Sequence, residues 1–125
     1  MHGKKNGTGK EYDDGELIFE GEYLNGKRNG KGKEFNFDGK LKFEGEYLND
    51  LKNGKGKEYN NNGRLIFEGE YLDDFKNGEG KEYDDSGKLI YEGKFILGFR
   101  IWTVKTYNKK CLINIWILIV KWIKN

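Results

Sequence analysis

Proline is absent from this sequence, and cysteine and histidine each occur only once in its 125 residues. The single cysteine, Cys111, cannot form a disulfide within the chain, so nothing points to an oxidising compartment. His2 stands alone near the N-terminus and Cys111 has no partner base, so the sequence supplies neither a metal-ligand set nor an activated nucleophile. We therefore expect no catalytic, cofactor-binding or metal-binding residues, and no enzyme.

Apolar residues are also scarce, because hydrophobic residues make up 35% of the chain, the same share as charged residues. This balance approaches that of disordered chains. An aromatic content of 15% and 19 glycines argue against disorder and favour a regular architecture that needs little core per residue.

Long apolar runs are missing as well. Residues 1–10 do not have the pattern of a signal peptide. The apolar stretch 111–123 is interrupted by Asn114 and Lys121, and it is shorter than the roughly 20 apolar residues of a membrane-spanning helix. We expect a cytoplasmic protein that lies, at most, peripheral to a membrane.

Acidic residues are missing from the last 27 positions, although the chain contains 21 of them. Residues 1–98 are net acidic, whereas residues 99–125 carry six basic residues and all three tryptophans. Composition therefore divides the chain into a region 1–98 and a basic, partly apolar C-terminal segment 99–125. Because the longer region is net acidic, we expect no nucleic-acid partner.

What the sequence does contain is a repeat with a period of 24 residues. LIFEGEYL at 17–24 recurs as LKFEGEYL at 41–48, LIFEGEYL at 65–72 and LIYEGKFI at 89–96. Self-similarity at a fixed period indicates a repeat array. It argues against a phosphate-binding loop, since no Lys-Ser/Thr ending follows the recurring glycines. The array comprises a half repeat, three complete units and a partial unit, at residues 6–16, 17–40, 41–64, 65–88 and 89–98.

Each unit has the pattern of two β-strands. In the first unit, Phe19, Gly21 and Tyr23 alternate with Glu20 and Glu22, as expected for a strand with two different faces. Asp-Gly and Asn-Gly pairs between units supply the positive φ of hairpin turns. The pattern predicts an all-β fold, an elongated single-layer antiparallel sheet of tandem β-hairpins. Polar stretches within the units are the predicted loops, at residues 25–29, 49–53 and 73–77.

The recurring Tyr/Phe-Glu-Gly-Glu-Tyr, Asn-Gly-Lys and Asn-Gly-Lys-Gly resemble the MORN motif (membrane occupation and recognition nexus). The resemblance covers about residues 6–98 and implies an elongated, twisted sheet with a scaffold or adaptor role. For this family, protein partners, self-association and phosphoinositide membranes are all suggested. Asp50 and Asp74 depart from the motif, because they replace its middle glycine.

The aromatic and glycine residues of the motif are the expected binding site for a partner helix or for a second copy of the chain. Glycines in the strands would let the rings lie flat against the backbone. The expected partner-binding residues are Phe19, Tyr23, Phe43, Tyr47, Phe67, Tyr71, Tyr91 and Phe95. The expected structural glycines are Gly21, Gly30, Gly32, Gly45, Gly54, Gly56, Gly69, Gly78, Gly80 and Gly93.

The charged residues of the array have simpler interpretations. The pair Asp13-Asp14 and its counterparts lie in predicted turns, where Asp is favoured, and they lack the ligand spacing of a calcium loop. We expect Glu20, Glu22 and their copies to face solvent and to pair across strands with lysines such as Lys33.

Three interpretations of residues 99–125 remain open. The segment is a cap or degenerate repeat that covers the open end of the sheet, the product of a reading-frame slip, or an interfacial anchor with Trp at headgroup depth and Lys on anionic lipid. In the last case the lipid-binding residues are Arg100, Trp102, Lys105, Lys109, Lys110, Trp116, Lys121, Trp122 and Lys124.

Three functions are therefore compatible with the sequence. The first is a non-catalytic scaffold or adaptor that binds a protein partner or a second copy. The second is a peripheral module that binds anionic membranes. The third is a regulatory repeat fragment of a larger enzyme, such as a phosphatidylinositol phosphate kinase.

Overall fold

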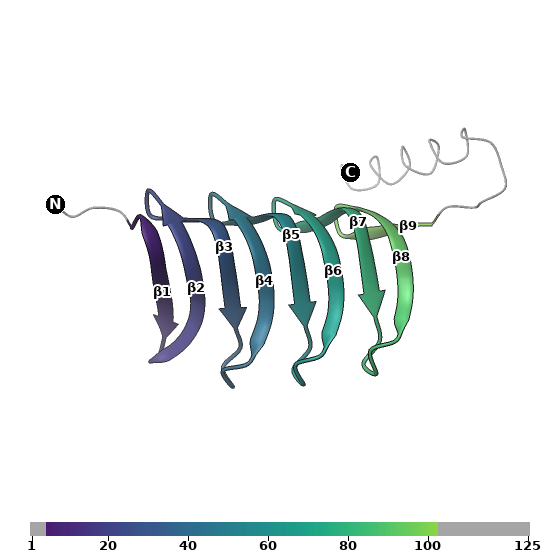
Figure 1. Ribbon diagram of the computed structural model, residues 1–125, viewed down its shortest axis with the longest axis horizontal. Helices are drawn as coiled ribbons and strands as arrows, with labels where there is room; N and C mark the ends of the chain where they lie inside the picture. Colours follow the sequence, from purple (N-terminus) through teal and green to yellow (C-terminus); the bar gives the residue numbers. More distant parts are fainter. Residues whose placement is uncertain (1–4, 103–125) are drawn as a thin grey trace, which may run out of the picture.

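The computed structural model describes residues 5–102, which form one open antiparallel sheet of nine strands (Figure 1). Each strand pairs with its neighbours in sequence, so the hairpins follow one another along the long axis in a single layer. This confirms the predicted all-β fold. Within the described stretch, no helix is long and apolar enough to cross a bilayer. The strands are β1 (Gly7–Asp13), β2 (Glu16–Leu24), β3 (Lys27–Phe35), β4 (Leu41–Leu48), β5 (Leu51–Tyr59), β6 (Leu65–Leu72), β7 (Phe75–Tyr83), β8 (Leu89–Ile96) and β9 (Phe99–Ile101).

The two faces of the sheet follow from the alternation in the even-numbered strands. Phe19 and Tyr23 of β2 are buried on one face, and the intervening glutamates point to the other. Because a single-layer sheet has no second sheet to pack against, the rings pack on one another. Phe19 contacts Tyr23 within its hairpin and Tyr47 of the next hairpin, both edge-to-face, with ring centroids 5.8 and 5.2 Å apart. Such pairs continue through Tyr91 and Phe95, and they form the core.

After the two-residue turn Asp14-Gly15 between β1 and β2, the hairpin turns alternate between two kinds. At one end of the strands, two-residue turns such as Asn25-Gly26 have positive φ at both residues, as type I′ turns require. At the opposite end of the strands, five-residue loops follow β3, β5 and β7. The first residue of each loop accepts backbone hydrogen bonds. In the first of these loops, Asn36 Oδ1 accepts the N–H groups of Asp38 and Lys40.

The predicted loops at 25–29, 49–53 and 73–77 are wrong in extent. Only the first two residues of each form the turn, and the next strand begins directly afterwards. The Asn-Gly pair that ends each predicted loop, such as Asn29-Gly30, lies inside a strand, and Gly30 adopts φ +104° at a shift in the β2–β3 register. Glycine accommodates this conformation without the strain that a side chain would cause. The strand therefore bends at the bulge and continues.

The aspartates that replace the middle glycine of the motif keep the turn conformation. Asp50 and Asp74 have φ values of +73° and +74°. Their carboxylates accept backbone N–H bonds from Arg28 and Lys52, each at 2.8 Å. Each aspartate therefore links its turn to the preceding hairpin, which glycine could not do through a side chain.

The sheet continues past residue 98, where composition predicts its end. β9 pairs with Lys94, Phe95 and Ile96 of β8, so the first residues of the C-terminal segment belong to the sheet. In the sequence, Phe99 and Arg100 stand one period after Phe75 and Lys76, the start of β7. β9 is therefore the beginning of a further unit. The competing interpretations of the C-terminal segment concern residues 99–125, of which 103–125 lie outside the described residues.

Candidate functional site

The sheet presents an aromatic face and a charged face. The aromatic face carries the eight rings predicted as partner-binding residues, and each is at most 8% exposed. Phe19, Phe43 and Phe67 are almost completely buried. The structure therefore places these residues in the core, where the rings themselves offer little area to a partner. Partner binding through them stays a prediction from the sequence.

Glycines create the space in which the rings lie. Gly21, Gly32, Gly45 and Gly56 belong to one row of paired glycines that crosses the sheet from β1 to β8. A Cβ on Gly56 would lie 2.6 Å from Phe43 Cζ, which is closer than carbon atoms can pack. The row therefore allows each phenylalanine to lie flat on the backbone of its own hairpin.

Cations cover the rings from outside. The Arg28 guanidinium lies 4.0 Å from the centre of the Phe19 ring, and the ammonium of Lys52 lies 4.1 Å from that of Phe43. Lys76 and Arg100 occupy the same position over Phe67 and Tyr91. Each cation desolvates a ring face and gains cation–π attraction. The four cations form a periodic outer layer on the aromatic face.

Carboxylates hold these cations in place. Glu11 accepts two hydrogen bonds from Arg28, at 2.8 and 3.1 Å, and one from the Tyr23 hydroxyl at 2.6 Å. The bond from Arg28 is the main reason why the pKa of Glu11 lies below its usual value. Burial, followed by the hydrogen bond to Glu11, raises the pKa of Tyr23. The neutral phenol and the ionised carboxylate are therefore the stable forms at neutral pH.

The same arrangement recurs in the next two hairpins. Tyr47 donates to Glu34 and Tyr71 donates to Glu58, and burial raises the pKa of both tyrosines. Phe95 takes the tyrosine position in the last hairpin, so Glu82 receives no phenol. Arg100 donates to Glu82, as Arg28 does to Glu11. The aromatic face is thus tied together by ion pairs that run from one hairpin to the next.

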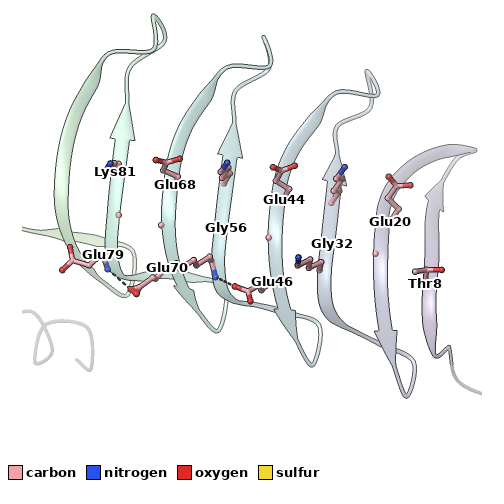
Figure 2. A pocket seen from close by; sticks show the side chains of 18 of the residues that line it. Thr8, Glu20, Gly32, Glu44, Glu46, Gly56, Glu68, Glu70, Glu79 and Lys81 are labelled. Atoms are coloured by element: carbon pink, nitrogen blue, oxygen red, sulfur yellow. Dashed lines mark hydrogen bonds between the residues drawn. The ribbon is translucent and has the colours of Figure 1, made fainter.

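The charged face carries a row of alternating charges across eight strands. In this row Glu20 pairs with Lys33, and Lys33 in turn pairs with Glu44 of the following strand. Every neighbour along the row has the opposite sign, which favours each cross-strand pair. Figure 2 shows Glu20, Glu44, Glu68 and Lys81 of this row on β2, β4, β6 and β7. The row consists of Lys10, Glu20, Lys33, Glu44, Lys57, Glu68, Lys81 and Glu92.

A second row lies nearer the two-residue turns. Here the Glu22, Glu46 and Glu70 carboxylates accept the backbone N–H of the following strand at each bulge, at 2.6, 2.6 and 3.1 Å. Two of these bonds are drawn as dashed lines in Figure 2. These glutamates lie on the outer face as expected, and Glu46 pairs with Lys31 across the strands. In addition, they accept backbone N–H groups at the bulges, which the sequence did not indicate.

The first row, together with Glu46 and Glu70 of the second, lines a groove of about 1480 Å³ that crosses the sheet from β1 to β8. Its floor is made of the charged side chains and of glycine backbone between them. Beyond the second row, exposed apolar residues lie on the same face next to the two-residue turns. Among them are Leu48, Leu51, Leu72 and Phe75. The Lys–Glu pairs were predictable from the sequence, whereas this groove was not. Because Lys and Glu each recur at the same position every 24 residues, the sequence could have indicated a continuous row of charges.

The structure describes only two of the predicted lipid-binding residues. Arg100 bonds to Glu82 and covers Tyr91, so its charge is engaged on the aromatic face. Trp102 is 60% exposed, and its ring centre lies 5.0 Å from that of Tyr91. The others, from Lys105 to Lys124, lie outside the described residues. Between residues 5 and 102, no cluster of three or more His, Cys, Asp or Glu side chains forms a candidate metal site.

Comparison with known families agrees with this geometry. The chain is an array of antiparallel β-hairpins that repeats every two strands. Family models described as MORN repeat match residues 19–40 and 43–64, and one described as MORN repeat variant matches residues 76–96. These matches cover more than half of the chain, which belongs to the MORN repeat family. No curated protein is similar enough to count as a match.

Proposed function

We propose that the chain is a non-catalytic scaffold that holds a segment of a partner protein in the groove of the charged face. MORN repeats are generally a non-catalytic repeat module. The observation that carries the proposal is the groove itself, which crosses eight strands. At a strand spacing of about 4.8 Å it spans about 34 Å, the length of about ten extended residues or about 23 helical residues.

The charges in the groove favour a partner segment that carries both signs. Along the first row, a charge of one sign recurs at every second strand, or about every 9.6 Å. In an extended peptide this distance corresponds to about three residues. A segment that repeats a basic or an acidic residue at that interval would match Glu20, Glu44 and Glu68, or Lys33 and Lys57.

The aromatic face is the alternative location for a partner. Its rings are covered by Arg28 and Lys52 in the first two hairpins, so a partner there would meet cations before aromatic carbon. The groove, in contrast, has open space above its charges. This difference supports the charged face.

Site-specific photo-crosslinking tests the location. A photoreactive residue is placed at Lys57 in the groove, at Lys52 on the aromatic face, or at the exposed loop residue Asn62 as a control. The variants are irradiated in an extract of the cells that make the protein. We expect one partner to be captured from position 57 and not from 62. Capture from position 52 alone would move the site to the aromatic face, and equal capture from all three positions would contradict a defined site.

Anionic membrane surfaces are a second candidate partner. It is favoured by the six basic residues and complete lack of acidic residues in 99–125, together with the exposed Trp102. If the segment binds lipid, the full chain should float with anionic vesicles, and a variant with Lys109→Glu and Lys110→Glu should not. Flotation that is the same on neutral vesicles, or for the variant, would contradict this role.

A further inference from the structure

The two ends of the sheet are complementary to each other. β1 has the sequence pattern of an odd-numbered strand, since NGTGKEY at 6–12 matches NGKGKEF at 29–35. β8 has the pattern of an even-numbered strand, with Tyr91, Glu92 and Gly93 in the places of Phe67, Glu68 and Gly69. Inside the sheet, even strands are followed by odd ones in a constant register. The outer edge of β8 therefore has the sequence pattern that pairs, inside the sheet, with a strand like β1.

Most of that edge carries no strand in the part of the chain that the structure describes. β9 pairs only with Lys94, Phe95 and Ile96. Leu89–Gly93 have a strand partner on the β7 side alone. At the opposite end, the outer edge of β1 also has no strand partner among residues 5–102. Unpaired strand edges of this kind are sites of strand addition.

The terminal side chains lack contacts that their interior counterparts have. Lys33 lies between Glu20 and Glu44, whereas Lys10 has a strand neighbour of opposite charge, Glu20, on one side only. Glu92 likewise has Lys81 on one side only, and its side chain is 61% exposed. The two ends therefore carry half-satisfied charges of opposite sign.

The apolar residues at the two ends show the same pattern. Ile90 on β8 is 50% exposed, whereas Ile66 at the corresponding position of β6 is partly buried. Tyr12 on β1 is 59% exposed, whereas its counterparts Phe35 and Tyr59 are partly buried. In the interior register, these two exposed residues would become neighbours across the junction of two copies.

We propose that the chain associates head to tail with second copies of itself, the β1 strand of one copy adding to Leu89–Gly93 of the next. The interior register then places Gly9 opposite Gly93, Lys10 opposite Glu92 and Glu11 opposite Tyr91. β9 remains on the other half of β8, so each junction is short and the association is weak and concentration-dependent. Because the contact joins two different edges, it generates open chains rather than closed dimers. It uses strand edges, although Lys10 and Glu92 also line the two ends of the groove.

Disulfide trapping between single-cysteine variants of the full chain tests the junction. In a Cys111→Ser background, a Lys10→Cys variant is mixed with a Glu92→Cys variant under mild oxidation. The matched control mixes Lys10→Cys with Glu68→Cys, which lies in the same charge row on β6, between two other strands. Circular dichroism verifies that each variant is folded.

We expect the 10–92 pair to form at least about ten times more dimer than the 10–68 pair. Equal yields for the two pairs would overturn the proposal, and so would a dominant 10–10 dimer, which indicates pairing of two β1 edges. Sedimentation of the unmodified chain is a second measurement. Average mass should rise with concentration, and a Glu92→Lys variant should reduce that rise. A mass that stays monomeric up to millimolar concentration would also overturn the proposal.

Discussion

Gly56 lies against the ring of Phe43 so closely that an added Cβ would stand 2.6 Å from Phe43 Cζ and 3.0 Å from Tyr71 Cε1. The phenylalanine belongs to the same hairpin as the glycine, and the tyrosine belongs to the next. One missing side chain therefore makes room for contacts within a hairpin and between hairpins. Because each unit contacts only its neighbours, these contacts determine how well the array holds together.

The first prediction concerns this glycine. Gly56→Ala should lower the free energy of unfolding by about 2–3 kcal/mol, since the new methyl group overpacks the ring layer. Gly63→Ala is the control. Gly63 has φ +83° with no atom near its missing Cβ, so only backbone strain applies, about 1 kcal/mol. Urea unfolding of both variants measures the difference, and equal losses would contradict the role of the ring contact.

Alkaline pH should weaken the fold through the buried tyrosines. The pKa values of Tyr47 and Tyr71 are raised in the folded chain, so both phenols stay protonated there after they ionise in the unfolded chain. Their contribution to stability is complete below about pH 10 and is lost as the pH rises further, by about 1.4 kcal/mol per pH unit for each tyrosine.

Phenylalanine substitutions test this pH dependence. Phe95 occupies the equivalent position in the last hairpin, so the ring without its hydroxyl fits. Tyr47→Phe should cost about 1–2 kcal/mol at neutral pH through the lost bond to Glu34. It should also reduce the decline of stability between pH 10 and 11, and Tyr71→Phe added to it should reduce the decline further. Urea titrations at each pH measure both effects, and an unchanged slope in the double variant would contradict the assignment.

The turn aspartates should tolerate some replacements better than others. Asp74 combines a positive φ with a hydrogen bond from the backbone of Lys52. Asp74→Gly keeps the conformation and loses the bond, so we expect a loss of about 1 kcal/mol or less. Asp74→Ala loses the bond and adds backbone strain, for a total of about 2 kcal/mol. Thermal or urea unfolding gives the order, and an alanine variant as stable as the glycine variant would contradict it.

Much of the fold was predictable because the repeat displays each structural feature several times. The alternation of Phe19, Gly21 and Tyr23 with glutamates predicts a two-faced strand, and its return every 24 residues predicts a single-layer array. The chemistry of the turns was also readable. The glycines of the Asp-Gly and Asn-Gly pairs between units, such as Gly15 and Gly63, have the expected positive φ.

The extent of the odd-numbered strands was not predictable from local sequence. Asn29-Gly30 reads as a second turn signal, but Gly30 supplies the positive φ of a bulge within β3. With residues 25–29 assigned to a loop, Arg28 could not be placed on the aromatic face, and its position over Phe19 was missed. The burial of the rings was missed for the same reason. The cations that cover them lie at the start of β3, β5 and β7, in stretches that were predicted to be loops.

The groove depends on residues that are individually unremarkable. Glu44 and Lys57 read as ordinary exposed residues of a strand, and only the register of the assembled sheet places them in one continuous row. The backbone role of Glu22 likewise depends on the bulge in the neighbouring strand. Both features are properties of the register, which pairwise sequence patterns do not specify.

The central claim, that the groove holds a partner segment, is tested most directly by titration of that segment. The peptide identified by crosslinking at position 57 is titrated by calorimetry into the chain and into a variant with Lys57→Gln and Glu68→Gln. A control variant with Glu16→Gln and Lys40→Gln removes the same charges at exposed positions outside the groove lining. We predict at least about tenfold weaker binding for the groove variant and unchanged binding for the control. Equal affinity for all three proteins would contradict the claim.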